Sequence, residues 1–383
     1  MDDFLIEDVN SIRSFFVIDS SKYVLYMTLV DNNHLSNHAM LVLFNVQEKK
    51  STKLDIRTTI SESKLDYGLN RLMVVDVPLI TLKQTTSKVE RVSWIAFNTG
   101  DSLSVLCFTD LLTSDAKVHK WNLDNPRDCI TDFDSKGDNN GNIRILYTTK
   151  LGNAHYIKFN TIFKKWSSIK SLNSIANDSL TCVSLGYSGL SDKWENRIGN
   201  IECAIISGFD NQLRHLRQHK SNDFKIESEV VYSTFKDNNI LTSIDYQIVK
   251  KRTSTSSIII CCGNITNLGC AIYKRTTSGN WVFLRFLNRI IHKDESISTV
   301  NCQIVPGSSE SEVLIYSGSE NGELYYWKFD WKQNAVTAEE VLKVAKDGNV
   351  IHHILCIRDS VYYLVNSERI GIYNAIHTPL KIH

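Results

Sequence analysis

Two pairs of histidines at four-residue spacing are the first residues in the sequence that could do chemistry. His34 and His38 form one pair, and His215 and His219 form the other. On a helix this spacing places both imidazoles on one face, where they can share a metal ion. Both pairs lie in turn-rich or strand-rich sequence, and no Cys-x-x-Cys spacing occurs that would complete a zinc site. We therefore expect solvated loop histidines and no metal site.

Two glycine-containing segments test the sequence for a nucleophile and for phosphate binding. LGYSGL (185–190) lacks the Gly-x-Ser-x-Gly spacing of a nucleophile elbow and does not lie at a strand-to-helix turn. GNITNLG (263–269) is not followed by Lys-Ser or Lys-Thr, and it spans two predicted strands instead of opening a helix. Both segments are interpreted as loops, so neither predicts a catalytic or cofactor-binding residue.

Neighbouring carboxylates are the remaining candidates for acid–base chemistry. They occur at Asp2-Asp3, at Asp132 with Asp134, and at Glu339-Glu340. With 42 acidic residues in 383, such neighbours arise by chance, and the sequence alone does not show which are buried. We assign no catalytic residue and no cofactor, and we predict that the chain is not an enzyme.

The densest basic cluster lies on a predicted strand and its edge. It comprises Arg214, Arg217, His219 and Lys220, and a second basic run, KKR, follows at 250–252. Charges at such a place protect an exposed strand edge from pairing with another chain. They also fit an acidic partner surface or RNA. The four residues of the first cluster are our candidates for partner binding.

Composition and cysteine usage favour a globular protein of the cell interior. The chain is 42% hydrophobic and 22% charged, and its net charge of +1 argues against a main role in binding nucleic-acid backbone. The nine cysteines lie mostly in apolar runs such as SIIICCG and are expected to be reduced. The start MDDFLIEDVN lacks a secretory pattern, and no apolar run reaches the roughly 18 residues of a membrane helix. We expect a location in the nucleus, the cytoplasm or both.

Short strands joined by tight turns recur along the whole chain. In SGSENGELYYWKFD (317–330), Asn321-Gly322 predicts a two-residue type I′ hairpin turn. Most such hairpins follow another strand candidate, and several precede a fourth, which is the plan of a propeller blade. The hairpin-like segments are 23–46, 103–123, 143–159, 203–218, 258–275, 313–329 and 361–374.

Helical patterns are scarce. ISESKLDYGLNRL (60–72) lies in the long gap between the first two hairpins and is expected to form an excursion that includes a short helix. AVTAEEVLKVAKD (335–347) fits an amphipathic helix through Val336, Val341 and Val344. It follows a middle hairpin directly, and we therefore favour an outer strand there.

The segment VLIYSGSENGELYYWKFD (313–330) resembles the middle of a WD40 repeat, and SGFDNQLRHL (207–216) and TSDAKVHKWNL (113–123) echo it. The resemblance to the WD40-like β-propeller superfamily implies an all-β fold: a single seven-bladed propeller over 1–383, with four antiparallel strands per blade and an inter-blade excursion near 50–90. Gly-His and Trp-Asp dipeptides, typical of the family, are missing. We therefore expect packing and sheet hydrogen bonds to hold the blades together.

A propeller must keep its first and last blades together, usually by pairing a strand from one terminus into the blade made by the other. FFVIDS (15–20) or FLIED (4–8) is expected to lie beside ERIGIYN (368–374), and PLKIH at the C-terminus is the alternative element for closure.

Function in such folds lies in surface residues that the fold does not specify. Without a catalytic signature, we expect a non-catalytic interaction scaffold that is a subunit of a larger intracellular multiprotein complex. Its partners are other protein subunits, with nucleic acid reached only indirectly and no small-molecule substrate. The alternatives are an accessory subunit of an RNA-modifying or chromatin complex, and a propeller hydrolase that uses the axial pocket.

Overall fold

The computed structural model consists almost wholly of β-strands. It describes residues 3–6, 12–18, 22–32, 36–60, 71–78, 90–113, 116–138, 140–172, 175–176, 179–187, 201–208, 212–218, 224–231, 241–249, 257–264, 270–275, 281–287, 299–309, 311–346, 349–357 and 360–374. The strands of the first half are β1 (Asp3–Ile6), β2 (Ile12–Ile18), β3 (Tyr23–Asn32), β4 (Ser36–Asn45), β5 (Lys50–Ile60), β6 (Leu72–Pro78), β7 (Arg91–Asn98), β8 (Ser102–Cys107), β9 (His119–Asn122), β10 (Ile130–Gly137), β11 (Asn142–Thr149), β12 (Ala154–Asn160) and β13 (Lys165–Leu172). Those of the second half are β14 (Leu180–Tyr187), β15 (Ile201–Gly208), β16 (Leu213–Gln218), β17 (Phe224–Val231), β18 (Leu241–Val249), β19 (Ser257–Asn264), β20 (Cys270–Arg275), β21 (Trp281–Leu287), β22 (Thr299–Pro306), β23 (Glu312–Ser319), β24 (Glu323–Asp330), β25 (Ala335–Lys343), β26 (Ile351–Ile357), β27 (Ser360–Val365) and β28 (Arg369–Asn374).

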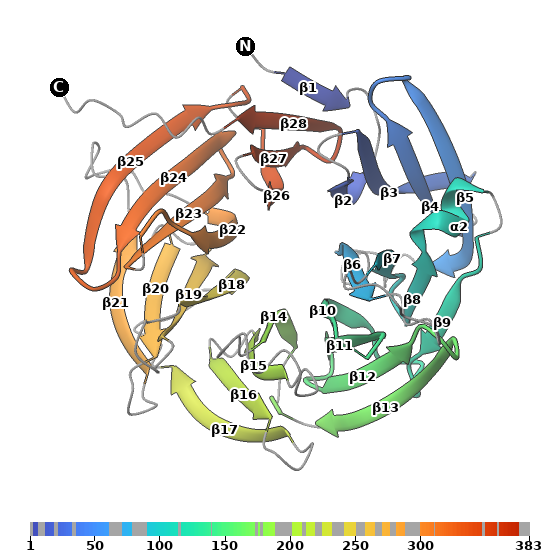
Figure 1. Cartoon of the computed structure of the whole chain (residues 1–383), viewed down its shortest axis with the longest axis horizontal. Coiled ribbons are helices and arrows are strands. Elements are labelled where there is room, and N and C mark those ends of the chain that lie inside the picture. The colour runs from blue at the N-terminus through green and yellow to red at the C-terminus, as the bar shows by residue number, and fades with distance from the viewer. Residues whose placement is uncertain are drawn as a thin grey trace. The chain divides into compact units, whose positions relative to one another are not determined.

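These strands form seven sheets of four strands within the described residues (Figure 1). Six sheets take their strands in chain order: β2–β5, β6–β9, β10–β13, β14–β17, β18–β21 and β22–β25. Neighbouring strands in the sheets pair antiparallel, as in β23 with β24, where Val313 faces Phe329 and Gly318 faces Leu324. The predicted plan of four antiparallel strands per unit is thus confirmed for these sheets.

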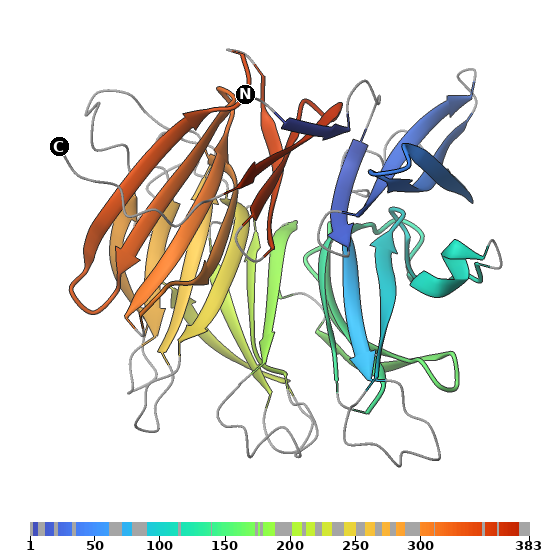
Figure 2. The ribbon, with the colours of Figure 1, turned by 45° about the horizontal axis from the view of Figure 1, so that its top comes forward.

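The chain divides into two compact units. The first unit comprises Met1–Asn10, Asn211–His215 and Ser228–His383, and the second comprises Ser11–Asp210 and Leu216–Glu227. The sheets β18–β21 and β22–β25 belong to the first unit, and their strands run side by side in Figure 2. The sheets β2–β5, β6–β9 and β10–β13 belong to the second unit.

Within the described residues, the structure contains no helix that is long and apolar enough to span a bilayer.

The seventh sheet of the chain joins its two ends. Strand β1 pairs antiparallel with β28, with Asp3 opposite Ile372 and Phe4 opposite Gly371, and the sheet order is β1-β28-β27-β26. The expectation that FLIED (4–8) lies beside ERIGIYN is confirmed. Of the other candidate, FFVIDS (15–20), residues 15–18 lie instead in β2, which pairs with β3, and residues 19–20 lie outside the described residues.

The turn at Asn321-Gly322 joins β23 to β24 as predicted, but its type differs from the prediction. A type I′ turn needs positive φ at both central residues. Among the described residues of this turn only Gly322 has a positive φ, of 72°, so the loop is Glu320, Asn321 and Gly322 with a left-handed last residue. The Gly322 carbonyl accepts hydrogen bonds from the backbone N–H groups of Val344 and Ala345, both at 3.1 Å.

A glycine with positive φ, whose carbonyl accepts a backbone N–H from beyond the fourth strand, also occurs at two other turns between the second and third strands of a sheet. Gly100, with φ 84°, accepts the N–H of Ile130 at 2.7 Å. Gly152, with φ 76°, accepts the N–H of Ile175 at 3.0 Å. In each case the donor follows the fourth strand of that sheet, so the turn glycine fixes the path of the chain as it leaves the sheet.

We expect Gly322→Ala to lower the free energy of unfolding by about 2 kcal/mol, because an L-residue is strained at this φ. A Cβ there would also lie 2.9 Å from the Ala345 Cβ. Glu320→Ala, an exposed change in the same loop, is the matched control and should stay within about 0.5 kcal/mol of the wild type. Urea unfolding measures both, and equal values for the two variants would contradict the role of this glycine.

One predicted hairpin is displaced by one strand. The segment 103–123 was expected to hold the middle strands of its unit, but it contributes the third and fourth strands, β8 and β9. The middle hairpin of this sheet is β7 with β8, around Gly100, and the first strand is β6. A one-turn helix, α2 (Phe108–Leu112), separates β8 from β9 and was not foreseen.

The choice of a strand at 335–347 is confirmed, since β25 covers Ala335–Lys343 and pairs with β24. The predicted short helix at 60–72 falls on 61–70, which lies outside the described residues. Residues 50–60 and 72–78, within the predicted excursion, are the strands β5 and β6.

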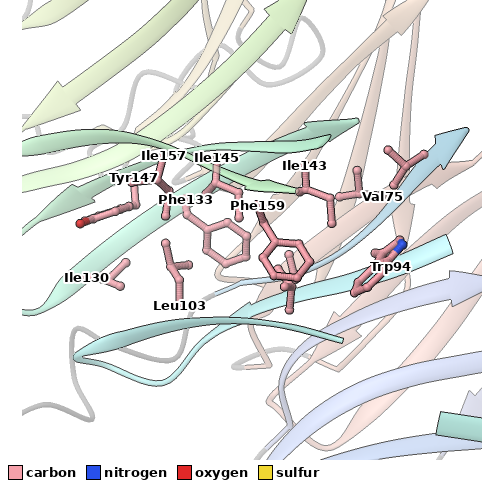
Figure 3. Packing of buried hydrophobic residues seen from close by; sticks show 13 residues of the cluster. Val75, Trp94, Leu103, Ile130, Phe133, Ile143, Ile145, Tyr147, Ile157 and Phe159 are labelled. Carbon is pink, nitrogen blue, oxygen red and sulfur yellow. The ribbon is translucent and has the colours of Figure 1, made fainter. Parts of the chain in front are cut away.

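Apolar side chains between neighbouring sheets form the cores. In the second unit Phe159 of β12 packs against Trp94 of β7, with ring centroids 5.4 Å apart. Phe133, Ile143 and Ile157, all 0% exposed, lie in the same cluster (Figure 3). Sheet β6–β9 and sheet β10–β13 therefore share one core, and strands buried on both faces follow from that arrangement.

Candidate interaction surface

The predicted basic cluster is only partly described. Arg214 lies in β16 and is 8% exposed, and its guanidinium donates to the backbone and side-chain oxygens of Gln212, each at 3.3 Å. Arg217 lies in the same strand, but its side chain is outside the described residues, as are His219 and Lys220 and the run at 250–252. We predicted that Arg214 is exposed, and this prediction is wrong, because its side chain is buried. Partner binding by the cluster stays a prediction.

Of the other residues considered for chemistry, His215 is fully buried and its ring contacts the Trp281 ring edge-on, with centroids 5.5 Å apart. A solvated loop position was expected for it and is wrong. Residues 188–190 and 265–269 lie outside the described part of the chain. Within the described part, no group of three or more His, Cys, Asp or Glu side chains is placed to hold a metal ion.

The carboxylates of Asp132 and Asp134 have a structural role that the sequence did not predict. Both lie on β10, the first strand of its sheet, and accept hydrogen bonds from β14, the first strand of the next sheet. Asp132 Oδ2 accepts the Val183 N–H at 2.9 Å, and Asp134 Oδ2 accepts the Leu185 N–H at 2.6 Å. The two side chains thus satisfy backbone donors at an otherwise unpaired strand edge.

Arg71 also joins β10 to β14, through contacts with Asp132 and Val183. Its Nη1 lies 3.2 Å from Asp132 Oδ2 and donates to the Val183 carbonyl at 3.0 Å. Burial raises the pKa of Asp132, while Arg71 and the Val183 N–H oppose the rise. The pair therefore bridges strands β10 and β14, both in the second unit, which is a structural use of charges that could otherwise do chemistry.

The same kind of bond recurs between other first strands. Each donor is a backbone N–H of the following sheet, and each acceptor is a polar side chain of the preceding one. The acceptors and donors are Ser14 Oγ with Leu72 N (3.0 Å), Ser243 Oγ with Cys302 N (2.8 Å), Asp245 Oδ2 with Ile304 N (2.9 Å), and Gln303 Oε1 with Cys356 N. Packing and sheet hydrogen bonds were expected to hold the sheets together; these side-chain bonds are an addition to them.

A second repeated feature is the turn between the third and fourth strands. In three sheets it begins with Phe-Asn or Phe-Asp, at Asn45, Asn160 and Asp330. The Oδ1 atom of each accepts the N–H groups two and three residues ahead, at distances of 2.9–3.1 Å. The residue four positions ahead has a left-handed φ of 52–54° in all three. The backbone of these turns is therefore the same.

The residues at the tips of these turns differ. In the first turn they are Gln47 and Glu48, and in the third they are Lys332 and Gln333, all exposed and polar. In the second turn the same two positions hold Ile162, which is 49% exposed, and Phe163, which is 72% exposed. The backbone geometry needs no apolar side chain there, because the other two turns form it with polar ones. The fold thus leaves this apolar tip without a structural reason.

Lysines surround the apolar tip. Lys164 and Lys165 follow it directly and are exposed, and Lys117 is exposed on the segment that leads into β9. Burial, and after it Lys117 and Lys164, lower the pKa of His119, while the carboxylate of Asp110 raises it. The two ammonium groups and this carboxylate are therefore all within electrostatic reach of the ring. In the part of the chain that the structure describes, no carboxylate forms an ion pair with these three lysines. We call Lys117, Ile162, Phe163, Lys164 and Lys165 the Phe163 surface.

Rigid packing supports the Phe163 surface from below. Phe159, on β12 before the turn, contacts the ring of His119 at 5.2 Å and that of Trp166 at 5.0 Å between centroids. Trp166, on β13 after the turn, also contacts Trp121 at 6.1 Å. Both ends of the turn are thus anchored in the shared core of Figure 3. The tip is presented by a preorganised support, which limits the entropy lost on binding.

Comparison with known proteins identifies a fold and no family. No protein-family model matches the sequence, and no curated protein matches it. Solved structures do resemble it. BBS1N in complex with ARL6DN has a TM-score of 0.56 at 10% identity, covering 99% of this chain and 97% of that chain.

Two further structures are similar over nearly the whole chain. Sqt1 of Saccharomyces cerevisiae has a TM-score of 0.57 at 11% identity, covering 100% of this chain and 86% of that chain. A catalytically inactive virginiamycin B lyase from Staphylococcus aureus, crystallised with quinupristin, has a TM-score of 0.54 at 12% identity, covering 97% and 99%. All three are β-propeller folds. At these identities the likeness concerns the fold alone, and it supports the propeller-like class predicted from the sequence.

Proposed function

We propose that this chain is a non-catalytic, WD40-like interaction scaffold and a subunit of a larger intracellular multiprotein complex. In this proposal its seven four-stranded sheets are the blades of one propeller over residues 1–383. One observation carries the functional part. Polar side chains on the first strands of the sheets, such as Asp134 and Asp245, accept hydrogen bonds from the backbone of the next sheet.

This observation bears on function because of where a propeller does chemistry. The first strands of its blades line the central channel, and a propeller enzyme would need converging polar groups at one of its mouths. In this chain the polar side chains of the first strands, such as Asp134 and Asp245, bond the backbone of the next sheet. This favours a structural role for the channel-lining strands and a binding role for the outer surfaces. BBS1N, one of the similar structures, was solved together with another protein, ARL6DN.

The cellular setting is part of the same proposal. The cysteines that the structure describes are free thiols, and they include the buried Cys129, Cys182, Cys270 and Cys302. Reduced cysteines suit the nucleus or the cytoplasm. Partners are then other protein subunits, and contact with nucleic acid would be indirect.

Purification of the tagged chain from cells, followed by size-exclusion chromatography and mass spectrometry, tests the proposal. We expect a fixed set of proteins to co-elute with the chain in constant ratios. The charge-reversing variant Arg217→Glu/Lys220→Glu is expected to lose at least one of them while its melting temperature stays unchanged. Arg214 is left intact because it is buried.

Two results would contradict the proposal. The first is a chain that elutes alone from cells under gentle lysis. The second is turnover of a small substrate by the purified chain that is abolished by a change at Asp132 or another first-strand carboxylate, with the fold preserved. Retention of every partner by the Arg217→Glu/Lys220→Glu variant would remove only that basic cluster from the proposal.

A further inference from the structure

The apolar tip of the Phe163 surface has no structural purpose that the repeated turns reveal. Three turns share one backbone conformation, yet only the second carries apolar residues at its tip. Phe163, at 72% exposed, is the most exposed large hydrophobic residue among those described. A phenylalanine left in water forgoes the favourable free energy of burying its apolar surface. A binding partner that buries it would recover that free energy.

The shape of the tip restricts what can cover it. Ile162 and Phe163 stand at the tip of a hairpin turn, preceded by the partly buried Thr161 and followed by the exposed Lys164 and Lys165. A specific protein interface buries roughly 800 Å² per partner around an apolar centre, in which lysine is depleted and arginine enriched. The basic residues here are all lysines. Two exposed apolar side chains followed directly by two lysines are a poor fit to such an interface.

The arrangement does fit an anionic lipid surface. Apolar residues at the apex can enter the boundary between headgroups and acyl chains, and lysines just behind them meet the headgroup phosphates and carboxylates. Trp166 follows the lysines in the sequence and packs against Phe159, which holds the end of the turn in place. An exposed apolar tip followed directly by lysines is the combination that such an interface demands.

We propose that the Phe163 surface docks this protein on an anionic membrane surface, with Ile162 and Phe163 inserted and Lys117, Lys164 and Lys165 against the headgroups. Each lysine near such a surface adds about 1 kcal/mol, and a single apolar tip adds little more than one or two buried side chains. The contact is therefore weak and reversible. It would strengthen when several copies, or other membrane-binding subunits, act together. This inference does not depend on the proposed scaffold function.

The test is co-sedimentation of the full-length chain with vesicles of phosphatidylcholine alone and with vesicles that also contain phosphatidylserine. We expect binding to the mixed vesicles, at least tenfold weaker binding to phosphatidylcholine, and a decline as salt is raised. The natural turns supply the variants. Ile162→Lys/Phe163→Gln copies the tip of the third turn, and Lys164→Asn/Lys165→Ala copies the two residues that follow it there.

The first variant separates insertion from simple charge attraction. It adds a positive charge, so attraction alone would tighten binding, whereas loss of the inserted side chains should weaken it by about tenfold. The second variant should weaken binding by about fivefold per lysine. Asparagine occupies the left-handed position of the third turn, so Lys164→Asn suits the backbone. Lys332→Gln/Lys346→Gln removes two exposed lysines elsewhere and should bind like the wild type.

Melting curves that match the wild type establish that each variant is folded. Failure of the wild type to sediment with phosphatidylserine vesicles at low salt overturns the proposal, and so does undiminished binding by Ile162→Lys/Phe163→Gln. A photoreactive residue at position 163 gives an independent measurement in cells. Adducts with phospholipid support the proposal, while a stoichiometric adduct with one protein assigns the tip to a protein partner and refutes it.

Discussion

Replacement of Asp138 by alanine is expected to lower the free energy of unfolding by about 3–5 kcal/mol, because it leaves a buried guanidinium without its counter-charge. Asp138 Oδ2 lies 2.7 Å from Arg144 Nε, and the two side chains are 0% and 9% exposed. Asp138 Oδ1 also accepts the backbone N–H groups of Asn140 and Asn142, both at 2.9 Å. One carboxylate thus supports both the β10–β11 turn and the arginine.

Urea unfolding followed by circular dichroism measures this loss. Asp138→Asn keeps the shape and some of the hydrogen bonds, and it should cost less than Asp138→Ala. Adding Arg144→Met to Asp138→Ala removes the unpaired charge and should restore part of the lost stability. Equal stabilities of the single alanine variant and the double variant would show that the cost comes from the turn and not from the buried charge.

Alkaline pH is expected to destabilise the second unit through two tyrosines. Burial raises the pKa of Tyr147 to about 12 and that of Tyr156 to about 12. In the unfolded chain a tyrosine titrates near 10. Between these values the unfolded chain releases a proton that the folded chain keeps. The resulting stability is fully present below about pH 10 and is lost as the pH rises toward 12, by up to about 2.7 kcal/mol per tyrosine.

The pH slope of unfolding, compared between the wild type and Tyr147→Phe, tests this expectation. Tyr147 Oη accepts the Trp121 Nε1–H at 3.3 Å, so the variant loses some stability at every pH. Removal of one titrating hydroxyl should nevertheless make its decline between about pH 9 and 11 shallower, by about 1 kcal/mol. Parallel slopes for the two proteins would refute the assignment. Lysines also titrate in this range, and they are common to both proteins.

Several features of the fold could be predicted because local patterns and tertiary structure agree. ELYYWKF (323–329) has apolar residues at successive positions, a pattern that predicts cover on both faces, and the structure places these residues in two different cores. Tyr325, Trp327 and Phe329 lie in one apolar cluster, while Leu324 lies in another. A strand with apolar residues at successive positions can be satisfied only between two layers.

Other features depend on contacts between distant residues and could not be predicted. Asn321-Gly322 is a strong signal for a two-residue turn, but the Gly322 carbonyl is also bonded by the N–H groups of Val344 and Ala345. The loop that carries this carbonyl has three residues, Glu320 to Gly322. The middle hairpin of the second sheet was missed because its turn, at Gly100, lacks an Asn-Gly or Asp-Gly pair. The strand that ends near Trp121 was taken as the third strand of the sheet, although it is the fourth.

The candidate site was missed for a different reason. Asp132 and Asp134 are two acidic residues among many, and only the position of β14 reveals what they bond. The Phe163 surface can be recognised in the sequence. Comparison of FNVQEKK, FNTIFKK and FDWKQNA, from positions 44, 159 and 329, shows one turn with apolar residues at its tip. That comparison needs the turns to be aligned first, which the structure makes possible.

The pairing of β1 with β28 has a consequence for the order of events during synthesis. A ribosome that adds about 5–20 residues per second completes β28 roughly 20 to 70 seconds after β1 has left it. Until then Asp3–Ile6 lacks the strand that it pairs with in the finished protein. The nascent chain must carry this unpaired apolar segment until β28 has been made, and its binding by a chaperone would prevent premature pairing with another nascent chain. The sheet β1-β28-β27-β26 can close only after the ribosome has added Asn374.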